Sequence, residues 1–221
     1  FEKHTPGVSV TLVKNEDYWE AEPKIDRLVF QLIPDNATAV QALLNGELDY
    51  MSLPATEVEN FKSNPDFTLI PYTLPSPTYM VFNFDQGKDV PFEVRKAIAM
   101  CVNREEISTK VFAGIQPPEY NFYPSAMGWS SNSAAPAPSY DIQGAISLLE
   151  GAGYKKDANG YYVAGLVLDC FGQASTDAAK LISSACKEAG IELVINSIEY
   201  QAWGTKVSTN QDFVVGMLGG F

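Results

Sequence analysis

The sequence predicts an α/β fold in which helices flank a mixed sheet. Segments with the β-branched and aromatic content of strands alternate with segments whose apolar residues recur at helical spacing. This alternation is typical of layered α/β domains with a partly parallel sheet. The composition, 46% hydrophobic and 19% charged, is that of an ordinary globular protein. No internal repeat or low-complexity tract breaks the order, so we expect residues 1–221 to form a single domain.

The first third of the chain predicts strands with one clear helix. That helix begins after Asp35 or Asn36, either of which can cap it, and ends at Gly46, a residue type that commonly closes helices. A short second helix over 54–63 has proline at its first position. The apolar face of the first helix consists of Val40, Leu43 and Leu44. The expected strands are 8–13, 25–33 and 48–53.

The middle of the chain, after a strand over 78–84, carries the sharpest helical pattern. Pro91 opens one helix, and Asn103 leads an Asn variant of the capping box for a second helix, which closes at Gly114. Residues 115–140 contain five of the 14 prolines, and a loop this long inside a compact domain tends to be functional. The apolar stripe of the first helix is Val94, Ala97, Ile98 and Cys101.

The last third of the chain alternates helices with strands. A helix over 141–152 precedes a strand that ends at Phe171. Ser175 is expected to cap the next helix, and Gly190 to stop it. The apolar stripes of the two helices are Ile142, Ala145, Ile146 and Leu149, and Ala178, Leu181, Ile182, Ala185 and Ala189. The strands that follow are 191–200 and 213–218.

The net charge of −12 argues against a nucleic-acid partner. A phosphate backbone needs clustered Lys and Arg, whereas here 15 basic residues face 27 acids. An anionic membrane surface is disfavoured for the same reason. We expect no membrane-spanning segment, since no apolar run approaches the ~20 residues that a spanning helix needs. The sequence begins at Phe1 without a methionine, so we expect a processed or trimmed chain.

The three cysteines, Cys101, Cys170 and Cys186, form no Cys-x-x-Cys motif. We interpret them as small buried hydrophobic residues, because an unpaired cysteine is among the most buried residue types. A Cys170–Cys186 disulfide is the alternative.

The sequence singles out no catalytic centre. His4 is the only histidine, and nothing beside it suggests a Ser-His-Asp or Cys-His arrangement. Motifs for metal hydrolysis and for phosphate or dinucleotide binding are absent from the sequence. Carboxylate pairs such as Glu105 with Glu106 lie on predicted helices and are interpreted as solvated faces. We therefore expect a binding module with no catalytic residues, no cofactor and no metal.

Several short sequence motifs follow one another in a fixed order along nearly the whole chain. A "Leu-Leu-x-x-Ala-Gly-Tyr" helix end and a "Pro-Phe-x-x-x-Arg-x-Ala" helix start are among them. In this order, the segments resemble the extracellular solute-binding proteins of family 5, which serve peptide- and nickel-importing ABC transporters. The segments are Lys14–Trp19 with Pro23–Asp26, Ala42–Asp49, Asn83 with Pro91–Ile98 and Asn103–Arg104, and Ser147–Tyr154.

The resemblance implies one lobe of a type II periplasmic-binding-protein-like fold, with residues 1–221 as the excised second lobe, which is inserted into the first. It implies that the protein clamps short peptides, or a related small solute, in a cleft between two lobes for import. The expected partners are that ligand, the first lobe of the same protein and the permease of an ABC transporter. The expected location is periplasmic or extracellular, with the full-length protein tethered to the membrane as a lipoprotein. The family's ligand-anchoring acid is expected beyond Phe221.

The resemblance points to candidate ligand-binding residues in the long loop, after a strand and at the end of the chain. Each has a structural alternative: Phe122 can fill the core, Gln173 can be an ordinary loop residue, and Gly219 with Gly220 can simply end a strand. Paired glycines also let a ligand backbone approach closely. The candidate residues are Asn121, Phe122, Tyr123, Phe171, Gly172, Gln173, Gly219, Gly220 and Phe221.

Four other polar or aromatic residues are interpreted as structural. Tyr18 and Trp19 are expected to pack, Asn83 to hold a strand end, and Arg95 to form an ion pair or lie in solvent.

Two other classes of function stay open. One is a sensing or partner-binding module that reuses the same lobe, which a co-purifying protein partner would support. The other is an unrecognised enzyme such as a hydrolase, which turnover lost on changing a single carboxylate would support. A ligand that exchanges unchanged supports the solute-binding interpretation.

Overall fold

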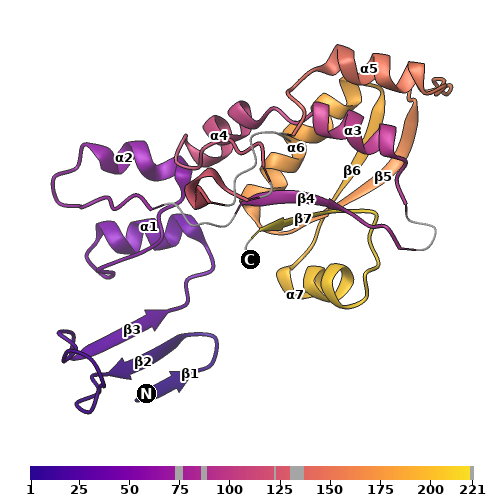
Figure 1. The fold of residues 1–221 in the computed structure, drawn as a ribbon. Coiled ribbons are helices and arrows are strands. Elements are labelled where there is room, and N and C mark those ends of the chain that lie inside the picture. Colours follow the sequence, from indigo (N-terminus) through magenta and orange to yellow (C-terminus); the bar gives the residue numbers. More distant parts are fainter. Residues whose placement is uncertain (73–76, 86–88, 122, 130–136, 220–221) are drawn as a thin grey trace. The chain divides into compact units, whose positions relative to one another are not determined.

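A computed structural model describes residues 1–72, 77–85, 89–121, 123–129 and 137–219 (Figure 1). The chain forms two compact units, unit 1 over residues 1–58 and unit 2 over residues 59–221, and each is described by itself. Phe122, Gly220 and Phe221 lie outside the described residues.

Unit 1 is a three-stranded antiparallel sheet followed by a helix. Strand β2 is central, and its pairing with β3 sets Val10 opposite Phe30 and Leu12 opposite Leu28. The strands predicted over 8–13 and 25–33 are confirmed, and β1 was not predicted. The elements are β1 (Lys3–Thr5), β2 (Ser9–Val13), β3 (Arg27–Gln31) and α1 (Asn36–Leu44), with a 3₁₀ turn at Ala55–Glu57.

Helix α1 begins where the sequence predicts. Asp35 is the cap, because its carboxylate accepts hydrogen bonds from the Thr38 amide at 2.8 Å and the Thr38 hydroxyl at 2.7 Å, and these bonds lower the pKa of Asp35. The prediction of Leu44 on the buried face is wrong, since it is 45% exposed. Ala39 and Ala42 take its place beside Leu43, at the helical spacing.

The strand predicted over 48–53 is also wrong, because the structure has no strand there. A short apolar run cannot show whether a pairing partner exists. Trp19, expected to pack, is 81% exposed, and its ring contacts Tyr18 at 5.8 Å between centroids.

Unit 2 contains a four-stranded mixed sheet of order β4-β7-β5-β6. Strands β5, β6 and β7 are parallel, and β4 runs antiparallel to β7 at the edge. Figure 1 shows α3, α5 and α6 on one side of this sheet and α7 on the other. The strands are β4 (Thr78–Phe82), β5 (Val163–Cys170), β6 (Ile191–Ser197) and β7 (Val215–Gly219). The helices are α2 (Val58–Lys62), α3 (Phe92–Met100), α4 (Arg104–Phe112), α5 (Ile142–Gly151), α6 (Gln173–Glu188) and α7 (Tyr200–Trp203).

Two shorter helical pieces complete unit 2. A 3₁₀ turn covers Ser125–Met127, and a π-helical segment over Gly204–Thr209 continues α7. The predicted mixed sheet flanked by helices is confirmed. Helix α7 and its π-helical continuation were not predicted.

The core of unit 2 lies between the sheet and the helices α3, α5 and α6. The apolar stripe predicted for α3 is buried in full, including Cys101 just after the helix, and so are Ala145 and Leu149 of α5. Asn103 caps α4 as predicted, with its side chain accepting from the Glu106 amide at 3.1 Å. The largest fully buried side chains of the described residues are Ile98, Leu149, Leu168 and Ile191.

The three cysteines are buried free thiols, as predicted, and Cys170 and Cys186 form no disulfide. The pKa of the Cys186 thiol is raised far above its usual range. The larger cause is a hydrogen bond with Cys101, and burial is the smaller one. Cys186 therefore stays protonated and unreactive in the folded core.

In the part of the chain that the structure describes, no helix is long and apolar enough to cross a bilayer. No group of three or more His, Cys, Asp and Glu side chains is placed to hold a metal ion in that same part.

Candidate ligand site

Three parallel strands end at one edge of the unit 2 sheet, which we call the carboxyl edge. It comprises Phe171–Gln173 after β5, residues 198–200 after β6 and Gly219 at the end of β7. In open α/β sheets, ligands bind beyond the carboxyl ends of the strands, because the chain there leaves the sheet and exposes backbone groups. The structure thus places Gly219 at the same edge of the sheet as the predicted segment Phe171–Gln173.

Phe171 lies in an aromatic cluster at this edge. Its ring centroid is 5.1 Å from that of Tyr200 and 4.6 Å from that of Trp203, both in tilted geometry. Trp203 is buried, whereas Tyr200 is 66% exposed and offers a ring face to solvent. Such a cluster combines a fixed aromatic base with an accessible surface for apolar or peptide groups.

Sequence reasoning assigned no role to Tyr200 or Trp203. The strand predicted over 191–200 included Tyr200, whereas β6 ends at Ser197. The available signal was the pair of aromatic residues spaced by three, a spacing that places them on one face of a short helix.

Gly172 turns the chain from β5 into α6. It has φ +72° and ψ 161°, a combination that is almost restricted to glycine. Its carbonyl accepts hydrogen bonds from the Thr176 amide at 3.1 Å and the Thr176 hydroxyl at 2.8 Å. The predicted cap at Ser175 is therefore wrong: the glycine backbone starts the helix earlier, and Ser175 lies inside it.

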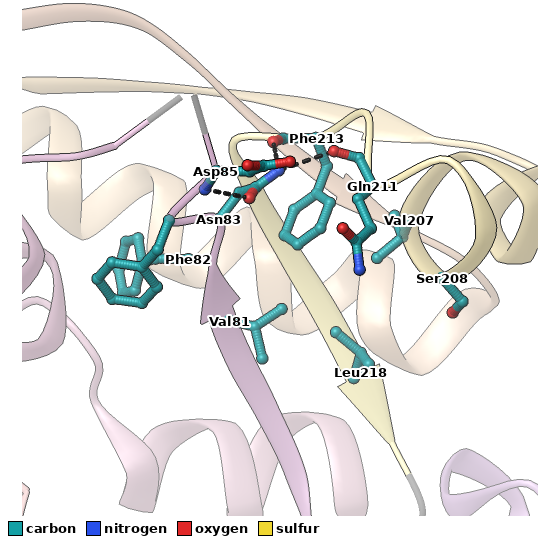
Figure 2. Close-up of a pocket in the computed structure, with 10 residues that line it drawn as sticks. Val81, Phe82, Asn83, Asp85, Val207, Ser208, Gln211, Phe213 and Leu218 are labelled. Carbon is teal, nitrogen blue, oxygen red and sulfur yellow. Dashed lines mark hydrogen bonds between the residues drawn. The ribbon is translucent and has the colours of Figure 1, made fainter. Parts of the chain in front are cut away.

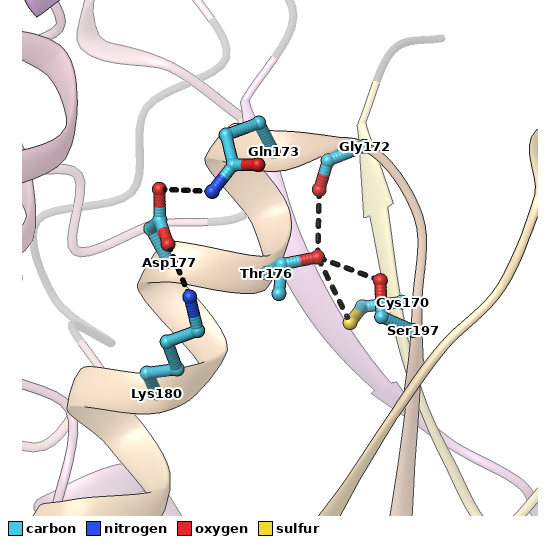
Figure 3. Close-up of polar contacts among 7 residues, drawn as sticks. All are labelled: Cys170, Gly172, Gln173, Thr176, Asp177, Lys180 and Ser197. Carbon is cyan, nitrogen blue, oxygen red and sulfur yellow. Dashed lines mark hydrogen bonds and ion pairs between the residues drawn. The ribbon is translucent and has the colours of Figure 1, made fainter.

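The start of α6 is bound to the neighbouring strand ends. The Thr176 hydroxyl lies 2.9 Å from the Ser197 hydroxyl and 3.8 Å from the Cys170 sulfur, and Figure 3 marks both contacts. Gln173 donates to Asp177 at 2.8 Å, and this bond, with a second from Lys180, lowers the pKa of Asp177. Gln173 thus fixes the first turn of α6 on its exposed side.

We predict that Gly172→Ala destabilises the protein by about 1–3 kcal/mol, because the alanine Cβ disfavours this backbone conformation. No atom lies within 4 Å of a Cβ built there, so the cost is one of backbone strain and not of a clash. The matched control is Gly151→Ala in α5, where φ is ordinary and a Cβ also meets nothing. It is expected to be neutral or stabilising by up to about 1 kcal/mol. Urea unfolding measures both; equal effects would contradict the strain argument.

Asn121 and Tyr123, also predicted as ligand-binding, lie in the loop after α4. Asn121 is half-buried, and Tyr123 is 46% exposed. Their role in ligand binding stays a prediction, as does that of Gly219, whose backbone pairs with Thr78 at the end of β7.

Arg104 and Tyr120 anchor the base of this loop. The Arg104 guanidinium donates to the Pro138 carbonyl at 3.1 Å and lies 5.1 Å from the Tyr120 ring centroid, and its burial lowers its pKa. The Tyr120 hydroxyl bonds to Glu105, which lowers the pKa of that carboxyl, and the Tyr120 carbonyl accepts from the Ala137 amide at 2.6 Å. The two ends of the loop are therefore held together.

An open groove of about 480 Å³ lies along β4, β7 and the π-helical segment (Figure 2). Val81, Val207, Phe213 and Leu218 give it apolar walls. The groove runs from Phe213, just before β7, to Leu218, near the end of that strand. Most of the residues that line it lie around the start of β7, away from the carboxyl edge, so we do not assign the ligand to it.

Asn83, at one end of this groove, has the structural role predicted for it. Its amide donates to the carbonyls of Gln211 at 2.8 Å and Phe213 at 2.9 Å, which joins the end of β4 to the start of β7. Arg95 forms the expected ion pair, with Asp89 at 3.0 Å.

The mixed sheet flanked by helices is that of a periplasmic-binding-protein fold. The chain belongs to the bacterial extracellular solute-binding proteins of family 5, since the model for the middle part of that family matches residues 1–221. Members of this family are extracellular or periplasmic proteins of ABC importers.

Particular relatives extend this assignment. The oligopeptide-binding protein AppA of Bacillus subtilis is 25% identical over 232 residues, which cover 99% of this chain and 42% of the relative. Lactococcal OppA, solved in its closed conformation with an endogenous peptide, has a TM-score of 0.85 at 19% identity and covers 99% of this chain and 46% of its own. NikZ of Campylobacter jejuni, solved with Ni(L-His), has a TM-score of 0.81 at 20% identity, covering 99% and 45%.

The two solved structures share the fold with this chain at low identity. The chain spans about two fifths of the length of the curated relatives that it matches, 40% for a peptide-binding protein of Brucella ovis and 42% for AppA.

Proposed function

We propose that this chain is the substrate-binding second lobe of a two-lobe solute-binding protein that captures short peptides, or a related small solute, for import by an ABC transporter. The observation that carries the proposal is the carboxyl edge, where three parallel strands, an aromatic cluster and a glycine turn meet. A solute held there is desolvated when a facing lobe closes over it by a hinge motion. Relatives that are oligopeptide- and dipeptide-binding proteins support peptides as the ligand class.

The proposal includes the partners and the location. Unit 2 forms the body of the lobe. The first lobe of the same protein faces the carboxyl edge, the permease receives the solute, and the full-length protein is tethered to the outer face of the membrane. The chain acts by binding and not by catalysis, in keeping with its membership of a solute-binding family.

The sheet of unit 1 supports contact with the rest of the full-length protein. All five residues of β3 are exposed. Leu28 and Phe30 lie opposite Leu12 and Val10, so these four apolar side chains share one face of the sheet. An apolar sheet face of this kind marks a contact surface, and the first lobe is the occupant that we propose.

Tyr200→Ala in the full-length protein tests the site. We expect about tenfold weaker binding of the tetrapeptide Ala-Phe-Ala-Ala, because an aromatic contact contributes about 0.5–1.5 kcal/mol and 1.4 kcal/mol corresponds to tenfold. The change should cost little stability, since Tyr200 is 66% exposed. Phe92→Ala, which removes a 61% exposed ring from α3, is the matched control and should bind normally. Calorimetry that shows equal affinities in both variants would place the ligand elsewhere.

A further inference from the structure

Three polar side chains from three segments meet just before the carboxyl edge. Asp169 of β5 is fully buried, and its Oδ1 accepts hydrogen bonds from Asn196 Nδ2 at 2.6 Å and from Lys206 Nζ at 2.6 Å. Asp169 lies two residues before Phe171, and Asn196 is the penultimate residue of β6. Lys206 comes from the π-helical segment that continues α7.

A carboxylate in this position is costly unless it is paired, because burial removes its hydration. Asp169 accepts both of these hydrogen bonds through Oδ1. Its Oδ2 is buried and has no hydrogen-bond partner among the described residues. The ion pair with Lys206, whose side chain is 31% exposed, is therefore the main compensation for the buried charge. Because the buried carboxylate needs a positive partner, the Lys206 ammonium is held next to Asp169.

The segment that carries Lys206 is irregular, and the buried Val207 is its apolar anchor beside the ion pair. It is a π-helical piece, a form that occurs mostly in short stretches and often at functional sites. Its backbone bonds are irregular: the Asn210 amide donates to the Thr205 carbonyl at 2.8 Å, and the Asp212 amide donates to the Lys206 carbonyl at 2.8 Å.

Lys206 lies in the same continuous helical segment as two aromatic residues of the site. Tyr200, Trp203 and Lys206 follow one another at steps of three residues, and the first two contact the ring of Phe171. If the segment shifts so that Lys206 moves away from Asp169, Trp203 and Tyr200 also move relative to Phe171.

We infer that the Asp169–Lys206 ion pair is a positioning device for ligand binding. It fixes α7 and the π-helical segment against β5, so that Tyr200 and Trp203 hold their places beside Phe171. This inference rests on the proposed function of the carboxyl edge. Its specific claim is that the pair sets geometry and not only stability, as buried polar pairs do in some proteins where they specify register.

The test must separate positioning from stability. Removing Lys206 alone strands a buried charge and can unfold the protein, so the decisive variant replaces both partners, Asp169→Leu with Lys206→Met. Replacing a buried ion pair by apolar residues of similar size is often neutral or stabilising. Lys206→Arg keeps the charge and serves as the conservative rescue. Lys180→Met removes an exposed lysine from its ion pair with Asp177 and is the control.

Two readouts are taken on the full-length protein: the affinity for Ala-Phe-Ala-Ala and the hydrogen exchange of amides 200–209. In the double variant we expect a cooperative, folded protein whose 200–209 amides exchange at least tenfold faster, with about tenfold weaker peptide binding. Lys206→Arg should recover most of the affinity, and Lys180→Met should match the wild type in both readouts.

The opposing results are equally defined. A double variant that keeps wild-type affinity, or that exchanges its 200–209 amides no faster, overturns the inference. If the wild-type protein binds no peptide at all, the peptide proposal for the carboxyl edge fails, and the exchange rates of 200–209 then decide on the positioning role alone.

Discussion

Ile98→Ala is expected to lower the free energy of unfolding of unit 2 by about 2–5 kcal/mol, the range for deleting a buried aliphatic side chain. Ile98 lies on α3 and is 1% exposed, within the core between the helices and the sheet. Alanine removes three methyl or methylene groups and leaves a cavity that close-packed neighbours fill only in part. The better helix propensity of alanine offsets only a few tenths of a kcal/mol.

The matched control for this prediction is Ile70→Ala, at a position that is 72% exposed in the same unit. It should change stability by less than about 0.5 kcal/mol. Urea denaturation followed by circular dichroism measures both variants. A loss below about 1 kcal/mol for Ile98→Ala would show that this helix does not pack on the sheet as described.

Asn83→Asp is expected to cost about 2–4 kcal/mol although it changes almost no volume. The Asn83 amide donates to two backbone carbonyls, those of Gln211 and Phe213, and Asn83 is only 7% exposed. An aspartate carboxylate has no N–H group to donate. It repels the two carbonyl oxygens and leaves them without these hydrogen bonds. Each unsatisfied buried group costs about 1–3 kcal/mol.

Asn64→Asp is the control for this change. The Asn64 side chain accepts from the Asp66 amide at 3.0 Å in an exposed turn, a role that a carboxylate fills equally well. Thermal unfolding should leave this variant within a few degrees of the wild type and lower the midpoint of Asn83→Asp clearly. Equal midpoints would mean that Asn83 does not join β4 to β7.

The sequence predicted the elements of unit 2 whose residues face the core. The stripe on α3 was correct in detail because packing against the sheet enforces helical spacing, and Asn103 was correct as a cap because its side chain satisfies a free amide locally. The cap of α6 was misplaced by three residues, at Ser175 instead of Gly172, since it depends on the backbone conformation of Gly172 and not on a capping side chain.

Residues 200–209 show what the sequence could not supply. Gly204 and three nearby Thr or Ser residues are weak helix formers, so no local pattern favours a helix there. The segment is held by the buried Val207 and by Lys206, whose partner Asp169 lies 37 residues earlier. The aspartate inside an otherwise apolar strand was a visible sign of a buried partner, but the sequence did not indicate which lysine it was.

The candidate site was predicted only in part, because some of its residues come together through contacts between distant parts of the chain. Phe171–Gln173 was found through the family resemblance, and the parallel strands bring it to the same edge as Gly219. Tyr200 and Trp203 join it only through tertiary contacts with Phe171.

Native mass spectrometry of the gently purified full-length protein tests the central claim most directly. If the protein captures short peptides at the carboxyl edge, the spectrum shows a ladder of peptide masses, one bound per protein, and Tyr200→Ala loses much of it. A site that is empty, or that holds a single non-peptide mass unaffected by Tyr200→Ala, would contradict this account.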